Sequence, residues 1–114
     1  MNSEVMVRSL DNCIIALSKT NDELNVLGIK KAIAEKAYIV KQAQEILNLK
    51  SNRQSVALVL ELVKANKKVA ELRLQMDIAE SEYYNCISKI ENLRIKINVI
   101  KSKVIKRHYL TSVF

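Results

Sequence analysis

The amino-acid sequence predicts an all-α fold, a helical hairpin with a long heptad-patterned C-terminal helix. Proline is absent from the 114 residues, Gly28 is the single glycine, and hydrophobic residues make up 49% of the chain against 4% for aromatic residues. In the C-terminal half, apolar or small residues recur at alternating four- and three-residue spacing, which keeps one stripe of a helix facing a partner. We therefore expect one helical domain over residues 1–114, with antiparallel coiled-coil or bundle packing in an oligomer.

The first helix is expected at residues 3–18. Its apolar side chains share one helical face: Met6, Leu10, Cys13 and Leu17, with Ile14 beside them. The isoleucine-rich centre of this segment leaves a strand as the alternative.

A second helix is expected at residues 21–49. The stretch Thr20-Asn21-Asp22-Glu23 has the form of a capping box, in which the threonine hydroxyl and the glutamate satisfy free amides at a helix start. The helix runs through Gly28, which costs about 1 kcal/mol relative to alanine and is a candidate kink. The expected inner face comprises Ile29, Ile33, Ala37, Val40, Ala43 and Leu47.

A wholly polar run from Lys50 to Ser55 predicts a reversal of the chain, with Ser55 placed to cap the next helix. Helices are then expected at residues 56–65 and 67–107. Asn66 is placed to end one helix and cap the next. Because the apolar spacing passes this point without a change of phase, a bent or locally opened helix is favoured over a long loop. That seam comprises Leu58, Leu62, Ala65, Val69, Leu72, Met76, Ala79, Tyr83, Cys86, Ile90, Leu93, Ile97, Ile100 and Val104.

The charges beside the seam favour antiparallel pairing. With Val69 at position a, Lys89 and Lys96 occupy g, and Arg94 and Lys101 occupy e, so that an in-register parallel homodimer would bring like charges together. We expect antiparallel pairing, within the chain or between chains. The residues expected to carry oligomerisation are Val69, Leu72, Met76, Tyr83, Cys86, Ile90, Leu93, Ile97, Ile100 and Val104.

The formal net charge of +7 is concentrated near the C-terminal end, because six bases and no acid come after Glu91. One interpretation is a solvated helical face that keeps the protein in solution; the other is a surface that binds a polyanion, repeated around an oligomer. Tyr109 and Phe114 either stack on unpaired bases or pack on a neighbour. The candidate nucleic-acid-binding residues are Lys64, Lys67, Lys68, Arg94, Lys96, Lys101, Lys103, Lys106 and Arg107.

Other classes of function find little support in the sequence. Cys13 and Cys86 form no metal or disulfide pattern and are expected to be buried thiols in a reducing compartment. No apolar run approaches the roughly 20 residues that cross a bilayer, and no secretory signal is evident, so that a cytoplasmic protein without a membrane partner is expected. His108, the single histidine, has no carboxylate or cysteine nearby in the sequence and is expected to be exposed. We expect no enzyme, cofactor, metal or small-molecule substrate.

The run from Ser55 to Lys106, SVALVLELVKANKKVAELRLQMDIAESEYYNCISKIENLRIKINVIKSKVIK, resembles small helical proteins of bacteriophages. Its arrangement is similar to that of the UvsY recombination-mediator family: a short helix, a charged break, an amphipathic helix with Tyr83 and Tyr84, and a closing segment. The resemblance implies a helical oligomer in the bacterial host cytoplasm that binds single-stranded DNA and helps a recombinase replace a single-strand-binding protein. Carried over by position, the DNA contacts would be Lys64, Lys67, Lys68, Arg94 and Lys101.

The sequence supports two functional hypotheses. The first is a non-enzymatic, oligomeric accessory protein that binds single-stranded nucleic acid through the phosphate backbone and so without sequence readout. The alternative is a protein-interaction module, such as an adaptor, a scaffold or a phage anti-defence inhibitor, that acts through its helical surface.

Overall fold

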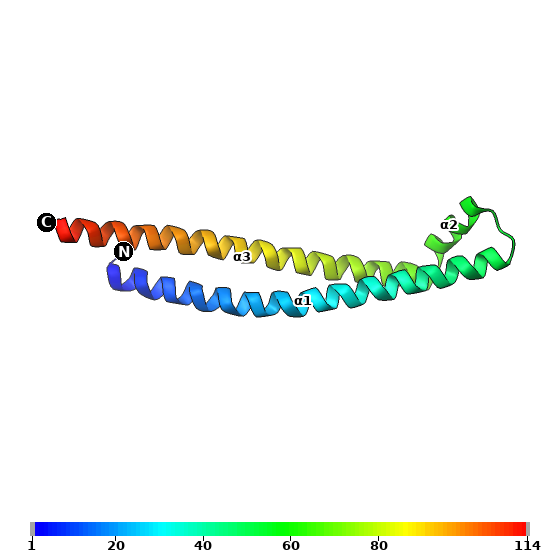
Figure 1. Ribbon diagram of the computed structural model, residues 1–114, viewed down its shortest axis with the longest axis horizontal. Coiled ribbons are helices and arrows are strands. Elements are labelled where there is room, and N and C mark those ends of the chain that lie inside the picture. Colours follow the sequence, from blue (N-terminus) through cyan, green and yellow to red (C-terminus); the bar gives the residue numbers. More distant parts are fainter. Residues whose placement is uncertain (1, 114) are drawn as a thin grey trace. The chain divides into compact units, whose positions relative to one another are not determined.

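The structure, a computed structural model, describes residues 2–113, with side chains up to residue 110. These residues form three helices and no strand: α1 (Ser3–Ser51), α2 (Val56–Ala65) and α3 (Lys67–Val113) (Figure 1). The prediction of an all-α helical hairpin is therefore confirmed. Contacts divide the chain into two compact units, one containing the segments up to Asn25 and from Tyr84 on, the other comprising Val26–Tyr83. The expected single domain stays a prediction.

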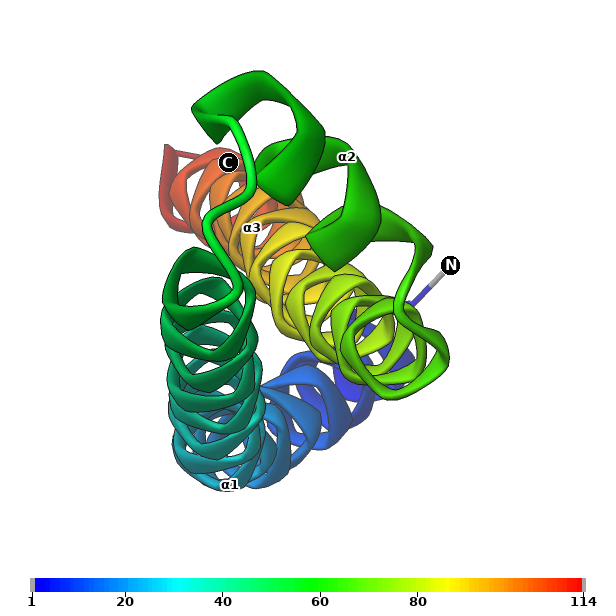
Figure 2. The same cartoon turned by 90° about the vertical axis from the view of Figure 1, so that its right-hand side faces the viewer.

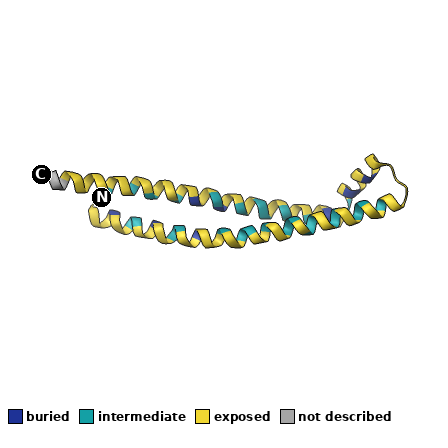
Figure 3. Ribbon diagram, in the orientation of Figure 1, coloured by how far each residue is buried: buried dark blue, intermediate teal, exposed yellow. Residues whose placement is uncertain are grey.

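In each unit, a segment of α1 runs antiparallel to a segment of α3, as the charges beside the seam predicted (Figure 1). Buried and half-buried residues form a stripe on the side of each helix that faces the other (Figure 3). On α3 this stripe comprises Val69, Leu72, Met76, Ala79, Tyr83, Cys86, Ile90, Leu93, Ile97, Ile100 and Val104. The residues expected to carry oligomerisation therefore pack within the chain, and oligomerisation itself stays a prediction.

The N-terminal part of α1 adopts the helical alternative. Asn2 caps the helix, since the amide of Val5 donates to its Oδ1 at 2.8 Å. Met6 and Cys13 are buried and Leu10 and Leu17 half-buried, which is the face that the sequence predicted.

The predicted break between residues 18 and 21 is wrong, because α1 is continuous from Ser3 to Ser51. Thr20 is buried inside the helix, where its hydroxyl donates to the carbonyl of Ala16 at 2.7 Å. Its own carbonyl accepts a weak bond from Cys86 Sγ at 3.5 Å, from α3. Packing against α3 thus fixes Thr20 as a seam residue and removes its role as a cap.

The inner face predicted for residues 21–49 is also wrong. Ile29, Ile33, Val40 and Leu47 are exposed, and the face turned toward α3 instead comprises Leu27, Lys31, Ala34, Tyr38, Lys41, Gln42, Glu45, Ile46 and Leu49. Because α1 has no break, the buried residues Met6, Cys13 and Thr20 determine which side of the helix faces α3. The 3.5-residue repeat, continued from Thr20, leads to the residues of this observed face. Lys31 and Lys41 on that face are half-buried, a degree of burial that the aliphatic part of a lysine side chain tolerates.

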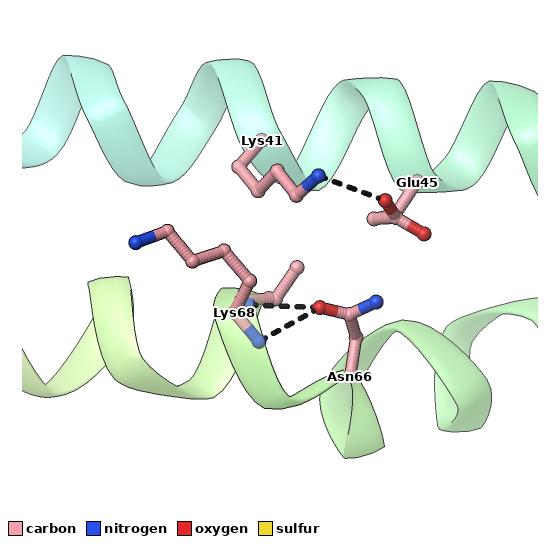
Figure 4. A network of polar contacts seen from close by, with 5 residues as sticks. Lys41, Glu45, Asn66 and Lys68 are labelled. Atoms are coloured by element: carbon pink, nitrogen blue, oxygen red, sulfur yellow. Dashed lines mark hydrogen bonds and ion pairs between the residues drawn. The ribbon is translucent and has the colours of Figure 1, made fainter.

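Ion pairs neutralise the charges on this inner face. Lys31 Nζ lies 2.6 Å from Glu35 Oε1 and 5.7 Å from the centre of the Tyr83 ring. Lys41 Nζ lies 3.1 Å from Glu45 Oε1 (Figure 4). The bond from Lys31 lowers the pKa of Glu35 below its ordinary value, partial burial opposes this change, and nearby Glu80 adds to the lowering.

The chain reverses between α1 and α2 and again turns at Asn66. Arg53 has a φ of 60° in the first turn, and Ser55 caps α2 by accepting a bond from the amide of Leu58 at 3.3 Å. Asn66 has extended backbone, and its Oδ1 accepts bonds from the amides of Lys68 and Val69, both at 3.0 Å (Figure 4). Asn66 therefore ends α2 and caps α3, as expected for helices at residues 56–65 and from 67 on, and no long loop separates the two helices.

The turn at Asn66 separates two sets of buried residues that do not follow one continuous heptad pattern. In α2, which lies beside the start of α3 (Figure 2), the buried residues are Val59 and Val63. They form a small core with Val69 of α3 against Tyr38, Ile46 and Leu49 of α1. Leu58 and Leu62, which the sequence placed on the seam, are exposed. A helix that stops at Asn66 cannot carry one continuous stripe from Leu58 to Val104, so the prediction holds only from Val69 on.

Candidate nucleic-acid interface

The basic segment of α3 lies in the unit formed with the N-terminal part of α1. Arg94 and Lys101 border the seam on one side, and Lys96 and Lys103 border it on the other. Each pair repeats after seven residues, which is about 10 Å along the helix. The exposed cations of this segment are Arg94, Lys96, Lys101, Lys103, Lys106 and Arg107. Two charged edges therefore run along α3, one with Arg94 and Lys101 and the other with Lys96 and Lys103.

Five of these cations lack an anionic partner within the described chain. The ion pairs of residues 2–113 do not include Arg94, Lys96, Lys101, Lys103 or Lys106. Lys89, one heptad before Lys96, lies 3.9 Å from Glu23 of α1, with both side chains more than half exposed. Glu23 thus balances the charge of Lys89, whereas the five cations named above have no anionic partner within the described chain.

A hollow of about 370 Å³ lies beside these cations. It is lined by Ala16 of α1 and by Asn85, Ser88, Lys89, Asn92, Leu93 and Lys96 of α3. The side chains of Asn85, Ser88 and Asn92 bond to no described residue, and small Ala16 leaves the hollow open on the α1 side. It therefore offers amide and hydroxyl donors between two ammonium groups, which suits phosphate and base oxygens.

Sequence reasoning missed the three polar residues of this hollow. Asn85, Ser88 and Asn92 recur at three- and four-residue spacing, which places them on one side of a helix next to Lys89 and Lys96. That spacing is visible in the sequence and was the available signal.

A second, shallower hollow lies on the outer side of the same helix. Ile95 and Val99 supply apolar surface, and Asn98, Ser102 and Lys103 supply polar groups. Tyr109 is exposed further along α3, whereas Phe114 lies outside the described residues. Exposed apolar side chains among cations are compatible with contacts to bases.

The smaller cluster Lys64, Lys67 and Lys68 lies in the other unit, at the corner between α2 and α3. Lys64 lies 3.8 Å from Glu61, and Lys68 lies 3.8 Å from Glu71. Only Lys67 of the three is without an ion pair in the described chain. Neighbouring acids thus partly neutralise this cluster.

No known protein family, curated protein or solved structure matches this chain. In the part that the structure describes, no helix has the length and apolar character that a membrane span requires.

Proposed function

We propose that the protein is an oligomeric accessory protein that binds single-stranded nucleic acid through the basic segment of α3. The observation that carries this proposal is the row of exposed cations from Arg94 to Lys106, without anionic partners in the described chain, next to a hollow lined by free amide and hydroxyl groups. A segment of this kind attracts phosphates and releases their counterions.

The mode of binding is set by the chemistry of the side chains. Lysine and arginine on a helix surface contact phosphates without reading sequence, and the hollow adds donors without selecting one base. Each exposed contact is weak, so several subunits on one strand are needed for useful affinity. We propose a role in recombination, as the resemblance to the UvsY family implies, with a recombinase and a single-strand-binding protein as partners.

The direct test is fluorescence anisotropy with a labelled single-stranded oligonucleotide. The variant Lys101→Gln/Lys103→Gln/Lys106→Gln removes three charges from exposed positions and leaves the packed face intact. We expect its dissociation constant to rise by more than about tenfold, which corresponds to about 1.4 kcal/mol. The matched control Lys19→Gln/Lys50→Gln/Arg53→Gln removes the same charge from exposed positions elsewhere and should bind like the wild type to within about threefold. Equal affinity of the two triple variants would refute the proposal.

A second function, that of a protein-interaction module, is favoured by α2. This helix carries Glu61 and Lys64 as its only charges, and Val56, Leu58, Leu60 and Leu62 are between 39% and 69% exposed. A helix that is apolar on most sides is ordinarily buried. Leu58→Gln/Leu62→Gln should then abolish partner binding in cells while nucleic-acid affinity stays unchanged.

A further inference from the structure

We infer that the unit Val26–Tyr83 binds a second copy of the chain, with the outer face of α1 on one copy packing antiparallel against the outer face of α3 on the next. This inference deepens the proposed function, which requires several subunits on one strand. The packed seam of α3 cannot supply this contact, because the chain's own α1 covers it.

The outer face of α1 is an apolar stripe with basic borders. Its exposed side chains have a heptad-like spacing: Val26, Ile29, Ile33, Val40 and Leu47 are between 45% and 68% exposed. Lys30 and Lys36 lie on opposite borders of this stripe and bond to no described residue. The two acids of this part of α1, Glu35 and Glu45, are paired with lysines toward the inner face.

The outer face of α3 in the same unit has the opposite charge. Residues 74–83 contain three acids and no base. Leu74 is 60% exposed and Ile78 is 50% exposed, one turn apart, and together they form a short apolar stripe. Asp77 and Glu82 lie on its two borders, exposed and without an ion pair to any described residue.

The two faces match in antiparallel register. In such a pair the same borders meet and the start of one stripe faces the end of the other. Lys30 of one copy then faces Glu82 of the next, and Lys36 faces Asp77. The axial spacing is about 9 Å between the lysines and about 7.5 Å between the acids. In this register Ile33 lies level with Ile78.

Charge decides between this contact and a symmetric one. Two outer faces of α1 would bring lysines together, and two outer faces of α3 would bring carboxylates together, which like-charge repulsion disfavours. The mixed contact pairs each lysine with an acid. A head-to-tail contact of this type closes into a ring or continues as a filament.

The register sets how far neighbouring copies are displaced along the helices. Within one chain Lys31 lies over the ring of Tyr83, so that residues 31 and 83 are level along the hairpin. The contact between copies sets residue 30 level with residue 82, which displaces neighbouring copies by only about 3 Å along the helices. Successive copies of this unit therefore lie side by side.

The test uses two charge-reversal variants and sedimentation velocity without nucleic acid. Lys30→Glu/Lys36→Glu makes the α1 face acidic, and Asp77→Lys/Glu82→Lys makes the α3 face basic. We expect the wild type to sediment as species heavier than the 13.0 kDa chain and each variant alone to lose these species. An equimolar mixture of the two variants should regain them, because each then offers the face that the other needs.

Lys19→Glu/Arg53→Glu is the matched control, with the same change of net charge away from both faces, and should assemble like the wild type. A monomeric wild type, variants that assemble unaltered, or an equimolar mixture of the two variants that stays monomeric would each overturn the inference.

Cysteine cross-linking gives an independent readout. Positions 33 and 78 lie on outward faces of antiparallel helices, so a bond between them must join two chains. Oxidised Ile33→Cys/Ile78→Cys should give a ladder of linked chains, whereas Ile33→Cys alone should not form dimers. The opposite pattern would show a symmetric α1 contact. The variant Lys101→Gln/Lys103→Gln/Lys106→Gln leaves both outer faces intact and should assemble like the wild type, so that failure of this interface and failure of nucleic-acid binding are distinguishable.

Discussion

Gly28 lies in the interior of α1 with ordinary helical backbone, so nothing in its conformation requires glycine. A Cβ at this position would lie 3.5 Å from Cε2 of Tyr83, an ordinary van der Waals contact. The packing of Tyr83 against α1 therefore leaves room for a methyl group.

Gly28→Ala should accordingly stabilise the protein. Alanine loses less backbone entropy than glycine on entering a helix, which is worth about 1 kcal/mol. Urea unfolding monitored by circular dichroism should show a midpoint above that of the wild type with an unchanged slope. A lower midpoint would show that Tyr83 needs closer contact with the backbone than the structure has.

Glu35 is the residue whose charge contributes to the pH dependence of stability. Lys31 holds the pKa of this carboxyl below its ordinary value of 4.5, so the ionised form is favoured by folding. The contribution is present above the ordinary value and is lost as pH falls through the lowered one.

Glu35→Gln should therefore be less stable than the wild type near neutral pH, and the difference should shrink as the pH is lowered to about 3. Urea unfolding at a series of pH values measures both proteins. A difference independent of pH would assign the effect to packing.

At the scale of elements, the sequence predicts helices more reliably than it predicts faces. The seam from Val69 to Val104 was predictable because its apolar residues dominate that face. The inner face of the second half of α1 was not, because Lys31, Lys41 and Glu45 occupy it while isoleucines point outward. The local pattern predicted that the isoleucines face α3. They do not, because α1 continues without a break from the buried Thr20, and this continuity determines which side of the helix faces α3.

The candidate interface was predictable in the same partial way. The cations after Glu91 stand out as a charge run, but whether acids neutralise them depends on the neighbouring helix. Lys89 meets Glu23 across the hairpin, at a sequence separation that no local pattern shows. The structure alone shows that Ala16 of α1 lines the same hollow as Asn85, Ser88 and Asn92 of α3.

Asn66 controls the junction of α2 and α3. Its Oδ1 accepts the first free amides of α3, and Asn66→Ala removes this cap at an expected cost of about 1 kcal/mol. Chemical denaturation should show the loss, whereas Asn48→Ala, at an exposed helical position without a capping role, should change stability by less than about 0.5 kcal/mol. Equal effects of the two substitutions would contradict the cap.

In the molecule as a whole, the charged residues fall into three groups according to their place in the structure. Lysines and acids on the inner face neutralise one another, the outer faces of Val26–Tyr83 carry complementary charge, and the cations from Arg94 to Lys106 have no anionic partner within the described chain. Assembly through the unit Val26–Tyr83 would place several such segments along one strand, which raises affinity without new contacts.

The salt dependence of oligonucleotide binding tests this account most directly. Each phosphate contact on a single strand contributes about −0.7 to the slope of log affinity against log salt concentration. Lys101→Gln/Lys103→Gln/Lys106→Gln should therefore lower the magnitude of the slope by about 2 per subunit engaged, relative to the wild type. An unchanged slope, or wild-type binding indifferent to salt, would contradict the claim that these cations bind the phosphate backbone.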